Sequence, residues 1–132
     1  MPPGSSSHSE GRAALRLAYA ADSAGREEEA LVHYRRAFEL GVPDEELAGA
    51  SLGFGSTLRN VGSVGESVDV LSEAVERFPE HRALRVFLAY ALWSAGRQAD
   101  AMRSLVEALY VGEPAAELER YRRAITGYAD DL

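Results

Sequence analysis

Three glycines set the spacing of this chain: Gly25, Gly62 and Gly96 lie 37 and 34 residues apart. Each of them separates two runs of mostly apolar residues, and a glycine in such a place is typical of a tight turn between two helices. A unit of about 34 residues that occurs three times predicts an array of helical hairpins. In such an array each hairpin buries its apolar face only by stacking on the next one.

Small side chains recur in register when the three units are aligned on these glycines. The equivalent residues are Ala18, Gly55 and Ala89; Ala30, Ser67 and Ala101; and Ala37, Ala74 and Ala108. Small residues at these places allow two helix backbones to approach closely. Bulky residues match in the same way, as Leu17, Phe54 and Leu88, and as Tyr34, Leu71 and Leu105.

Apolar residues at spacings of three and four predict seven helices joined by short connections. We expect them at about 11–24, 27–40, 44–60, 63–78, 81–95, 98–111 and 115–129. Ser63 and Glu66 fit a capping box at the start of the fourth helix. Residues 1–10 are rich in Pro, Gly and Ser and lack periodicity, so we expect a disordered segment there and a single domain over 11–132.

Composition argues against several classes of protein. The formal net charge of −7 disfavours nonspecific binding to nucleic acid, which depends on neutralising phosphates. No apolar run is long enough to span a bilayer, no signal peptide is recognisable and there is no cysteine, so we expect a cytoplasmic protein. All fourteen basic residues are arginines, whose planar guanidinium groups suit carboxylates.

The register of small residues resembles that of the tetratricopeptide repeat family. More narrowly, the chain is similar to compact bacterial proteins built of three such repeats and an end helix. The middle repeat of those proteins carries a string like Gly-Ser-Thr-Leu-Arg-Asn, which stands here at residues 55–60. The resemblance implies an all-α fold: a right-handed α-α superhelix of three hairpins plus a C-terminal capping helix. The repeats would span about 11–43, 44–80 and 81–113, and the cap about 114–130. The large aromatic residue expected early in each first helix is replaced by Ala14, Ser51 and Arg85.

The resemblance also implies that the first helices line a concave groove and that the second helices form the outer wall. Residues opposite the core positions of the first helices, Leu15 among them, should then point into the groove. As candidate peptide-binding residues we select Tyr19, Asp22, Ser56, Arg59, Asn60, Tyr90 and Trp93. Arg59 would bind a carboxylate through two parallel hydrogen bonds, Asn60 would bind the ligand backbone, and the aromatic rings would supply contact area.

Some of these residues have a structural alternative. Tyr90 and Trp93 could pack beneath the final helix, and for Trp93 we favour that core interpretation. Arg59 could cap its own helix and pair with an acid. The final helix carries an apolar stripe that should cover the open end of the third repeat, formed by Leu118, Tyr121, Ile125 and Tyr128.

Catalytic, metal and cofactor sites find little support in the sequence. The histidines lack the spacing of a metal site, and the three acids of residues 27–29 are best explained as partners of a helix dipole. We therefore expect a noncatalytic module that binds a peptide segment of a partner protein. The alternatives are a structural protein that forms a homodimer through the apolar side of its first helix, and a small-ligand protein or enzyme in which Asp22 acts as acid or base near Tyr90 and Arg59.

Overall fold

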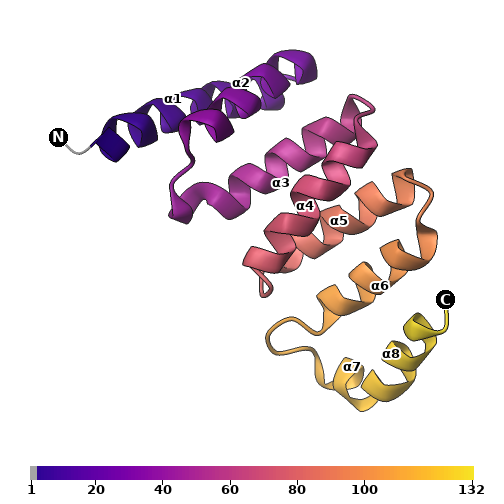
Figure 1. The fold of residues 1–132 in the computed structure, drawn as a ribbon. Coiled ribbons are helices and arrows are strands. Elements are labelled where there is room, and N and C mark those ends of the chain that lie inside the picture. The colour runs from indigo at the N-terminus through magenta and orange to yellow at the C-terminus, as the bar shows by residue number, and fades with distance from the viewer. Residues whose placement is uncertain (1–2) are drawn as a thin grey trace.

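The computed structural model describes the backbone of residues 3–132 and the side chains from His8 onward, and within these residues the fold is all-α. Six helices form three hairpins that stack one beside the next along the molecule (Figure 1). They are α1 (Pro3–Ser23), α2 (Glu27–Leu40), α3 (Asp44–Asn60), α4 (Val64–Arg77), α5 (Arg82–Ser94) and α6 (Gln98–Leu109). Two short helices, α7 (Ala116–Arg120) and α8 (Arg122–Asp130), follow them. No helix among the described residues is long and apolar enough to cross a membrane.

The three predicted turns share one geometry. Gly25, Gly62 and Gly96 have φ angles of 76°, 91° and 79°, a left-handed conformation that favours glycine. In each turn the N–H of the next residue donates to the carbonyl oxygen five residues earlier, at 2.8–2.9 Å, which satisfies a carbonyl group at the end of the helix. The glycine spacing therefore marks three equivalent hairpins, as predicted.

The small residues of the sequence register all lie in the core. Each of the nine is buried, and two glycines show how closely the helices approach. A Cβ atom added to Gly55 would lie 2.4 Å from the Cγ of Leu71, and one added to Gly53 would lie 2.3 Å from the hydroxyl oxygen of Tyr34. Larger side chains at these glycines would force α3 away from α2 and α4, which carry Tyr34 and Leu71.

Consecutive repeats pack through aromatic and aliphatic side chains. Phe54 on α3 lies between two rings of α2, with centroid distances of 6.0 Å to Tyr34 and 5.0 Å to Phe38. Leu17, the equivalent of Phe54 in the first repeat, is 55% exposed because no repeat precedes it among the described residues. Leu15 is buried, so its expected place in the groove is wrong: α1 packs against both α2 and α3, and Leu15 joins that core.

The expected capping box is also wrong. Ser63 makes no side-chain hydrogen bond to the start of α4, and the Glu66 carboxylate instead accepts two hydrogen bonds from Arg35 of the previous repeat, at 2.6 and 2.8 Å. The equivalent residues of the other repeats form the local ion pairs Arg26–Glu29 and Arg97–Asp100. Because serine replaces arginine in the second repeat, Glu66 has no local cation and pairs between repeats.

The N-terminal end differs from expectation. The backbone of residues 3–10, which we expected to belong to a disordered segment, continues α1 back to Pro3. Adding residues to an existing helix is far easier than nucleating a new one, so even a segment of weak helix formers can extend it. The rest of the expected segment, residues 1 and 2, lies outside the described residues.

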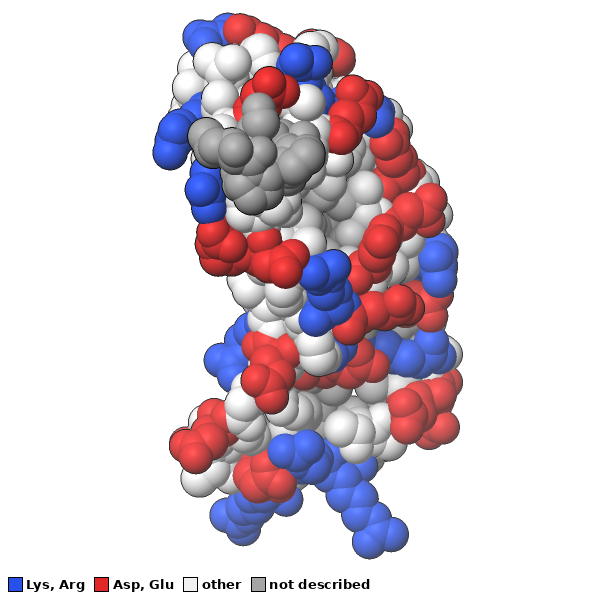
Figure 2. Space-filling view, turned by 60° about the vertical axis from the view of Figure 1, so that its left-hand side comes forward, with Lys and Arg blue, Asp and Glu red and all other residues white. Residues whose placement is uncertain are grey.

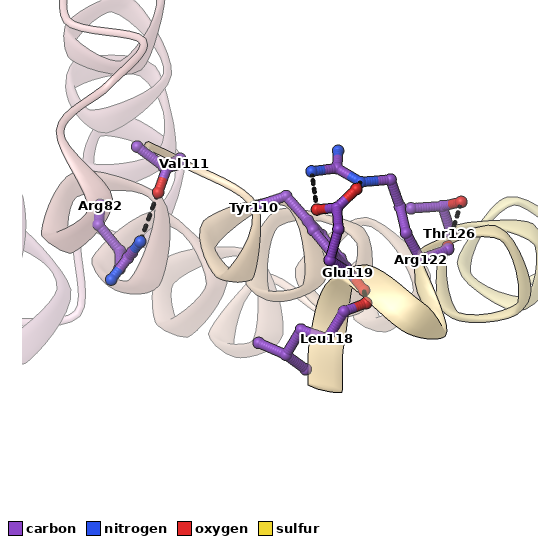
Figure 3. A network of polar contacts seen from close by, with 7 residues as sticks. All are labelled: Arg82, Tyr110, Val111, Leu118, Glu119, Arg122 and Thr126. Carbon is purple, nitrogen blue, oxygen red and sulfur yellow. Dashed lines mark hydrogen bonds and ion pairs between the residues drawn. The ribbon is translucent and has the colours of Figure 1, made fainter. Parts of the chain in front are cut away.

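The C-terminal cap is two helices instead of one. The chain turns at Tyr121, whose N–H donates to the carbonyl oxygen of Leu118 only three residues earlier, at 3.2 Å. This turn shifts the phase of the expected apolar stripe and leaves Tyr121 54% and Tyr128 75% exposed. The cap is held beside the end of α6 partly by polar contacts, among them a hydrogen bond of 3.0 Å from the Tyr110 hydroxyl to the Leu118 carbonyl oxygen (Figure 3). Leu105 on α6 stays 43% exposed, so the cap covers the end of the third repeat only in part.

Candidate functional site

The selected residues occupy equivalent positions on the first helices of the three repeats. Two rows cross α1, α3 and α5: one is Tyr19, Ser56 and Tyr90, and the other is Asp22, Arg59 and Trp93. Because α3 packs against both α1 and α5, the rows follow one another across the stack. Together with Asn60 and Ser94, which share the next position, we call these residues the first-helix face.

Arg59 is the cation of this face, and its side chain is held in place by two neighbours. Its Nε donates a hydrogen bond of 2.9 Å to the Ser94 hydroxyl, and its guanidinium carbon lies 5.6 Å from the centroid of the Tyr90 ring. No carboxylate of the described residues lies within ion-pair distance of Arg59, so the alternative in which it pairs with an acid is not what the structure shows. Arg12, on the same set of helices, is by contrast paired with both Glu45 and Glu46. The two terminal amino groups of Arg59 are thus available to an external carboxylate.

Two aromatic side chains lie exposed near this cation. Tyr90 is 54% and Trp93 58% exposed, and the Tyr90 ring rests edge-on against Phe87 at a centroid distance of 6.1 Å. The core interpretation that we favoured for Trp93 is therefore wrong. The reason is the placement of the cap, because α8 packs along α6 and leaves the exposed side of α5 uncovered.

Asn60 is already engaged by the preceding repeat. Its side-chain amide donates a hydrogen bond of 2.9 Å to Glu27, an acid that we had interpreted only as a helix-dipole partner. The carbonyl oxygen of the Asn60 side chain remains available as an acceptor. The signal that could have revealed this pair is its separation of 33 residues, which is close to one repeat length. Arg12 and Glu46, 34 residues apart, and Arg59 and Ser94, 35 residues apart, show the same relation.

Asp22 and Tyr19 belong partly to the core. The buried Tyr34 donates a hydrogen bond of 2.9 Å from its hydroxyl to Asp22, and burial, followed by this hydrogen bond, raises the pKa of Tyr34 far above its ordinary value. The Tyr19 ring meets Tyr34 edge-on at 6.0 Å, and its pKa is raised by burial first and by the nearby Glu46 second. A carboxylate that accepts from a buried tyrosine stabilises the first hairpin.

The acid–base arrangement of the enzyme alternative is not assembled. Asp22 lies on α1 and Tyr90 on α5, and α3 lies between these two helices in the stack. Among the described residues no group of three or more histidine, aspartate or glutamate side chains could hold a metal ion. Ser56 makes no side-chain hydrogen bond within the described part of the chain and is the smallest residue of its row.

Charged side chains cover the rest of the surface unevenly. Acidic and basic residues alternate over the three hairpins, while arginines project from the end that carries the cap (Figure 2). Arg120 and Arg123 of the cap are exposed, whereas Arg122 is held by Glu119, at 2.7 Å. The first-helix face thus combines exposed aromatic rings with a guanidinium, that of Arg59, which has no internal carboxylate partner.

Comparison with known proteins agrees with the helical-repeat fold. A family profile described as the tetratrico peptide repeat matches residues 11–132, which is nearly the whole chain. A search of curated proteins found no match. The matched range begins at Gly11, which is buried, directly after the exposed residues 8–10, and it includes all three hairpins and the cap.

Proposed function

The chain belongs to the tetratricopeptide repeat family, whose members generally mediate protein–protein interactions, and from that premise we propose that it is a noncatalytic module that binds a peptide segment of a partner on its first-helix face. The observation that carries the proposal is Arg59. A guanidinium held by Ser94 and Tyr90, with no internal carboxylate, is preorganised for a ligand carboxylate and loses little side-chain freedom on binding.

The surroundings of Arg59 indicate the kind of peptide. Tyr90 and Trp93 expose ring surface on the third repeat, and Asn60 offers an acceptor on the second. A peptide with a carboxylate at Arg59 and an apolar or aromatic side chain next to it would use all of these groups. Aromatic residues and arginine are the side chains that most often dominate binding energy at protein interfaces.

The proposal can be tested with peptides selected from a displayed random library against the purified protein. Binding of each selected peptide is then measured by calorimetry, with its carboxylates intact and after their conversion to amides. We expect Arg59→Ala and removal of the peptide carboxylate each to weaken binding about tenfold or more, since hydrogen bonds to charged groups contribute about 1.5–3 kcal/mol.

Arg123→Ala is the matched control, because Arg123 is an exposed arginine of the cap, away from the first helices. It should leave binding unchanged. Peptides that bind Arg59→Ala and the wild type equally well would show that the first-helix face, as defined, is not the binding site.

Self-association is a second candidate, favoured by exposed apolar residues on the first repeat. Leu17 is 55% and Val32 65% exposed, on α1 and α2. A second copy could cover them. Light scattering over a range of concentrations, with Leu17→Ser as the comparison, decides the matter: a wild-type protein that stays monomeric at every concentration excludes this candidate.

A further inference from the structure

One position in each first helix holds a different side chain in each repeat, and each of these three side chains borders a cavity. The residues are Ala14, Ser51 and Arg85, where the family resemblance leads one to expect a large aromatic side chain. Ala14 and Ser51 each line a depression between the two helices of their repeat, with volumes of about 360 and 190 Å³. Arg85 borders a cavity of about 510 Å³ that lies mainly between α6 and the cap. The three residues thus occupy equivalent positions that differ in side chain and surroundings.

In the third repeat this place holds a guanidinium group. The Arg85 side chain is only 18% exposed and forms an ion pair of 2.8 Å with Glu107 on α6. Its Nε and one terminal amino group also donate to the carbonyl oxygen of Pro79, at 3.2 and 3.1 Å. An arginine side chain thus fits between the two helices of a repeat when a carboxylate lies on the second helix.

In the second repeat the carboxylate is present and the arginine is missing. Ser51 takes the place of Arg85 and is buried, while Glu73 on α4 aligns with Glu107, 34 residues later. Glu73 lines the cavity and forms no ion pair with any described residue. The remaining walls are mostly apolar, formed by Phe38, Leu47, Val70, Ala74 and Phe78.

From this comparison we propose that the Ser51 cavity binds the guanidinium group of an arginine side chain from a partner peptide. Glu73 supplies the carboxylate, as Glu107 does for Arg85, and the rings of Phe38 and Phe78 supply apolar surface for a weakly hydrated planar cation. Arg77 also borders the cavity, but it is paired with Asp44 at 2.9 Å and lies over the Phe78 ring, so the carboxylate of Glu73 is not neutralised by it.

The first repeat provides an internal contrast. There Ala14 lines the equivalent cavity, but Arg36 stands where the other repeats have Glu73 and Glu107. A guanidinium in that cavity would meet a like charge. The acid that lines this cavity, Glu10, lies on the first helix, so a cavity with a carboxylate on the second helix and no internal arginine paired to it occurs only in the second of the three repeats.

The site is separate from the first-helix face. Ser51 lies eight residues before Arg59 on α3, about 12 Å along the helix axis. The inference goes beyond the proposed peptide-binding function, and either can fail without the other.

The probe for the experiment is Nα-acetyl-L-arginine amide, titrated into the ¹⁵N-labelled protein and followed by nuclear magnetic resonance. We expect saturable shifts of the backbone amides of Ser51, Glu73 and Phe78. Glu73→Gln should weaken the fitted affinity about fivefold, as for a partly exposed ion pair. Arg59→Ala should leave it unchanged, which separates this site from the first-helix face.

Three results would overturn the proposal. Equal shifts with Nα-acetyl-norleucine amide would show a merely apolar cavity. Equal affinity in Glu73→Gln would remove the carboxylate from the site. Shifts that do not saturate, or that appear at Tyr90 and Arg59 in place of Ser51, would show that the probe binds elsewhere or not at all.

A double-mutant cycle tests the same complementarity without a ligand. Ser51→Arg should restore the arrangement of the third repeat and raise the melting temperature by about 3 °C when Glu73 is present. It should also abolish the probe's shifts. In Glu73→Gln the same substitution should bring no gain, and Ala14→Arg, opposite Arg36, should lower the melting temperature. A gain that is independent of Glu73 would contradict the proposed pairing.

Discussion

Replacing Gly55 by alanine tests how closely the two helices of the middle repeat approach. The new Cβ atom would lie 2.4 Å from the Cγ of Leu71 and 2.6 and 2.9 Å from its two methyl carbons, distances that real Cβ atoms essentially never show. Leu71 is 1% exposed and has no open space to enter. A hydrogen bond of 2.7 Å from the Ser67 hydroxyl to the Gly55 carbonyl oxygen fixes the same two helices at this point. The substitution must therefore displace α3 from α4 or force Leu71 out of its rotamer.

Two opposing effects set the size of the change in stability. Overpacking in a tight core costs about 1–3 kcal/mol, and the absence of free space around Leu71 places this case in the upper half of that range. Alanine favours a helix interior over glycine by about 1 kcal/mol, which offsets part of the cost. We expect Gly55→Ala to lower the free energy of unfolding by about 1–2 kcal/mol and the melting temperature by about 3–10 °C.

The measurement is urea denaturation followed by far-ultraviolet circular dichroism. Gly65→Ala is the matched control, because a Cβ atom at Gly65 would meet no heavy atom within 4 Å. This control should be stabilising by about 0.5–1 kcal/mol through helix propensity alone. Adding Leu71→Ala to each glycine variant completes the comparison, since the loss caused by Gly55→Ala should largely disappear once the leucine is gone. If Gly55→Ala were as stable as Gly65→Ala, the close approach of α3 and α4 would be refuted.

Three further predictions follow from single side chains. Burial and the hydrogen bond to Asp22 raise the pKa of Tyr34, so Tyr34 stabilises the fold fully below the ordinary tyrosine pKa of about 10. This stabilisation declines as the pH rises above about 10. Tyr34→Phe should therefore make denaturation midpoints less sensitive to pH between about pH 10 and 12. Because the hydrogen bonds from Arg35 lower the pKa of Glu66, its contribution is present above about pH 4.3 and is lost as the pH falls. Glu66→Gln should reduce stability at pH 7 by less than about 1 kcal/mol, and the difference should shrink as the pH falls below about 4.3. Trp93 is the single tryptophan and is 58% exposed. The fluorescence of the native protein should therefore have the emission maximum of a solvated indole and be strongly quenched by acrylamide. A blue-shifted emission that acrylamide quenches weakly would mean that Trp93 is covered.

The scaffold was predictable because its determinants are local and repeat. A left-handed turn after a helix favours glycine, so Gly25, Gly62 and Gly96 are visible in the sequence before any contact is known. Close helix packing excludes side-chain volume, so the small residues of the register reveal buried positions in the same way. Both signals are reinforced by occurring three times at one spacing, and the structure confirms them.

The partners of the charged side chains were not predictable in the same way. Glu66 pairs with Arg35 and Glu27 with Asn60 because neighbouring repeats bring their ends within reach, a distance that no local pattern encodes. The exposure of Trp93 depends on where the cap packs, and this was decided by one short turn at Tyr121 that the apolar spacing did not reveal. A separation of about one repeat length marks such pairs as candidates, and the three-dimensional relation between repeats decides which of them form.

Function in such an array should lie where equivalent residues differ. Stability is close to a sum over hairpins and their neighbouring interfaces, so the buried small positions are constrained to be alike in every repeat. A position that holds Asp22, Arg59 and Trp93 in turn, or Ala14, Ser51 and Arg85, is not held to one kind of side chain in this way. At the first set the variation places one unpaired guanidinium beside two exposed rings. At the second it leaves the carboxylate of Glu73 beside a cavity, without the arginine that pairs with the equivalent Glu107 one repeat later. Comparing equivalent residues of the three repeats thus distinguishes the positions that build the scaffold from the two proposed binding sites, at Arg59 and at Ser51.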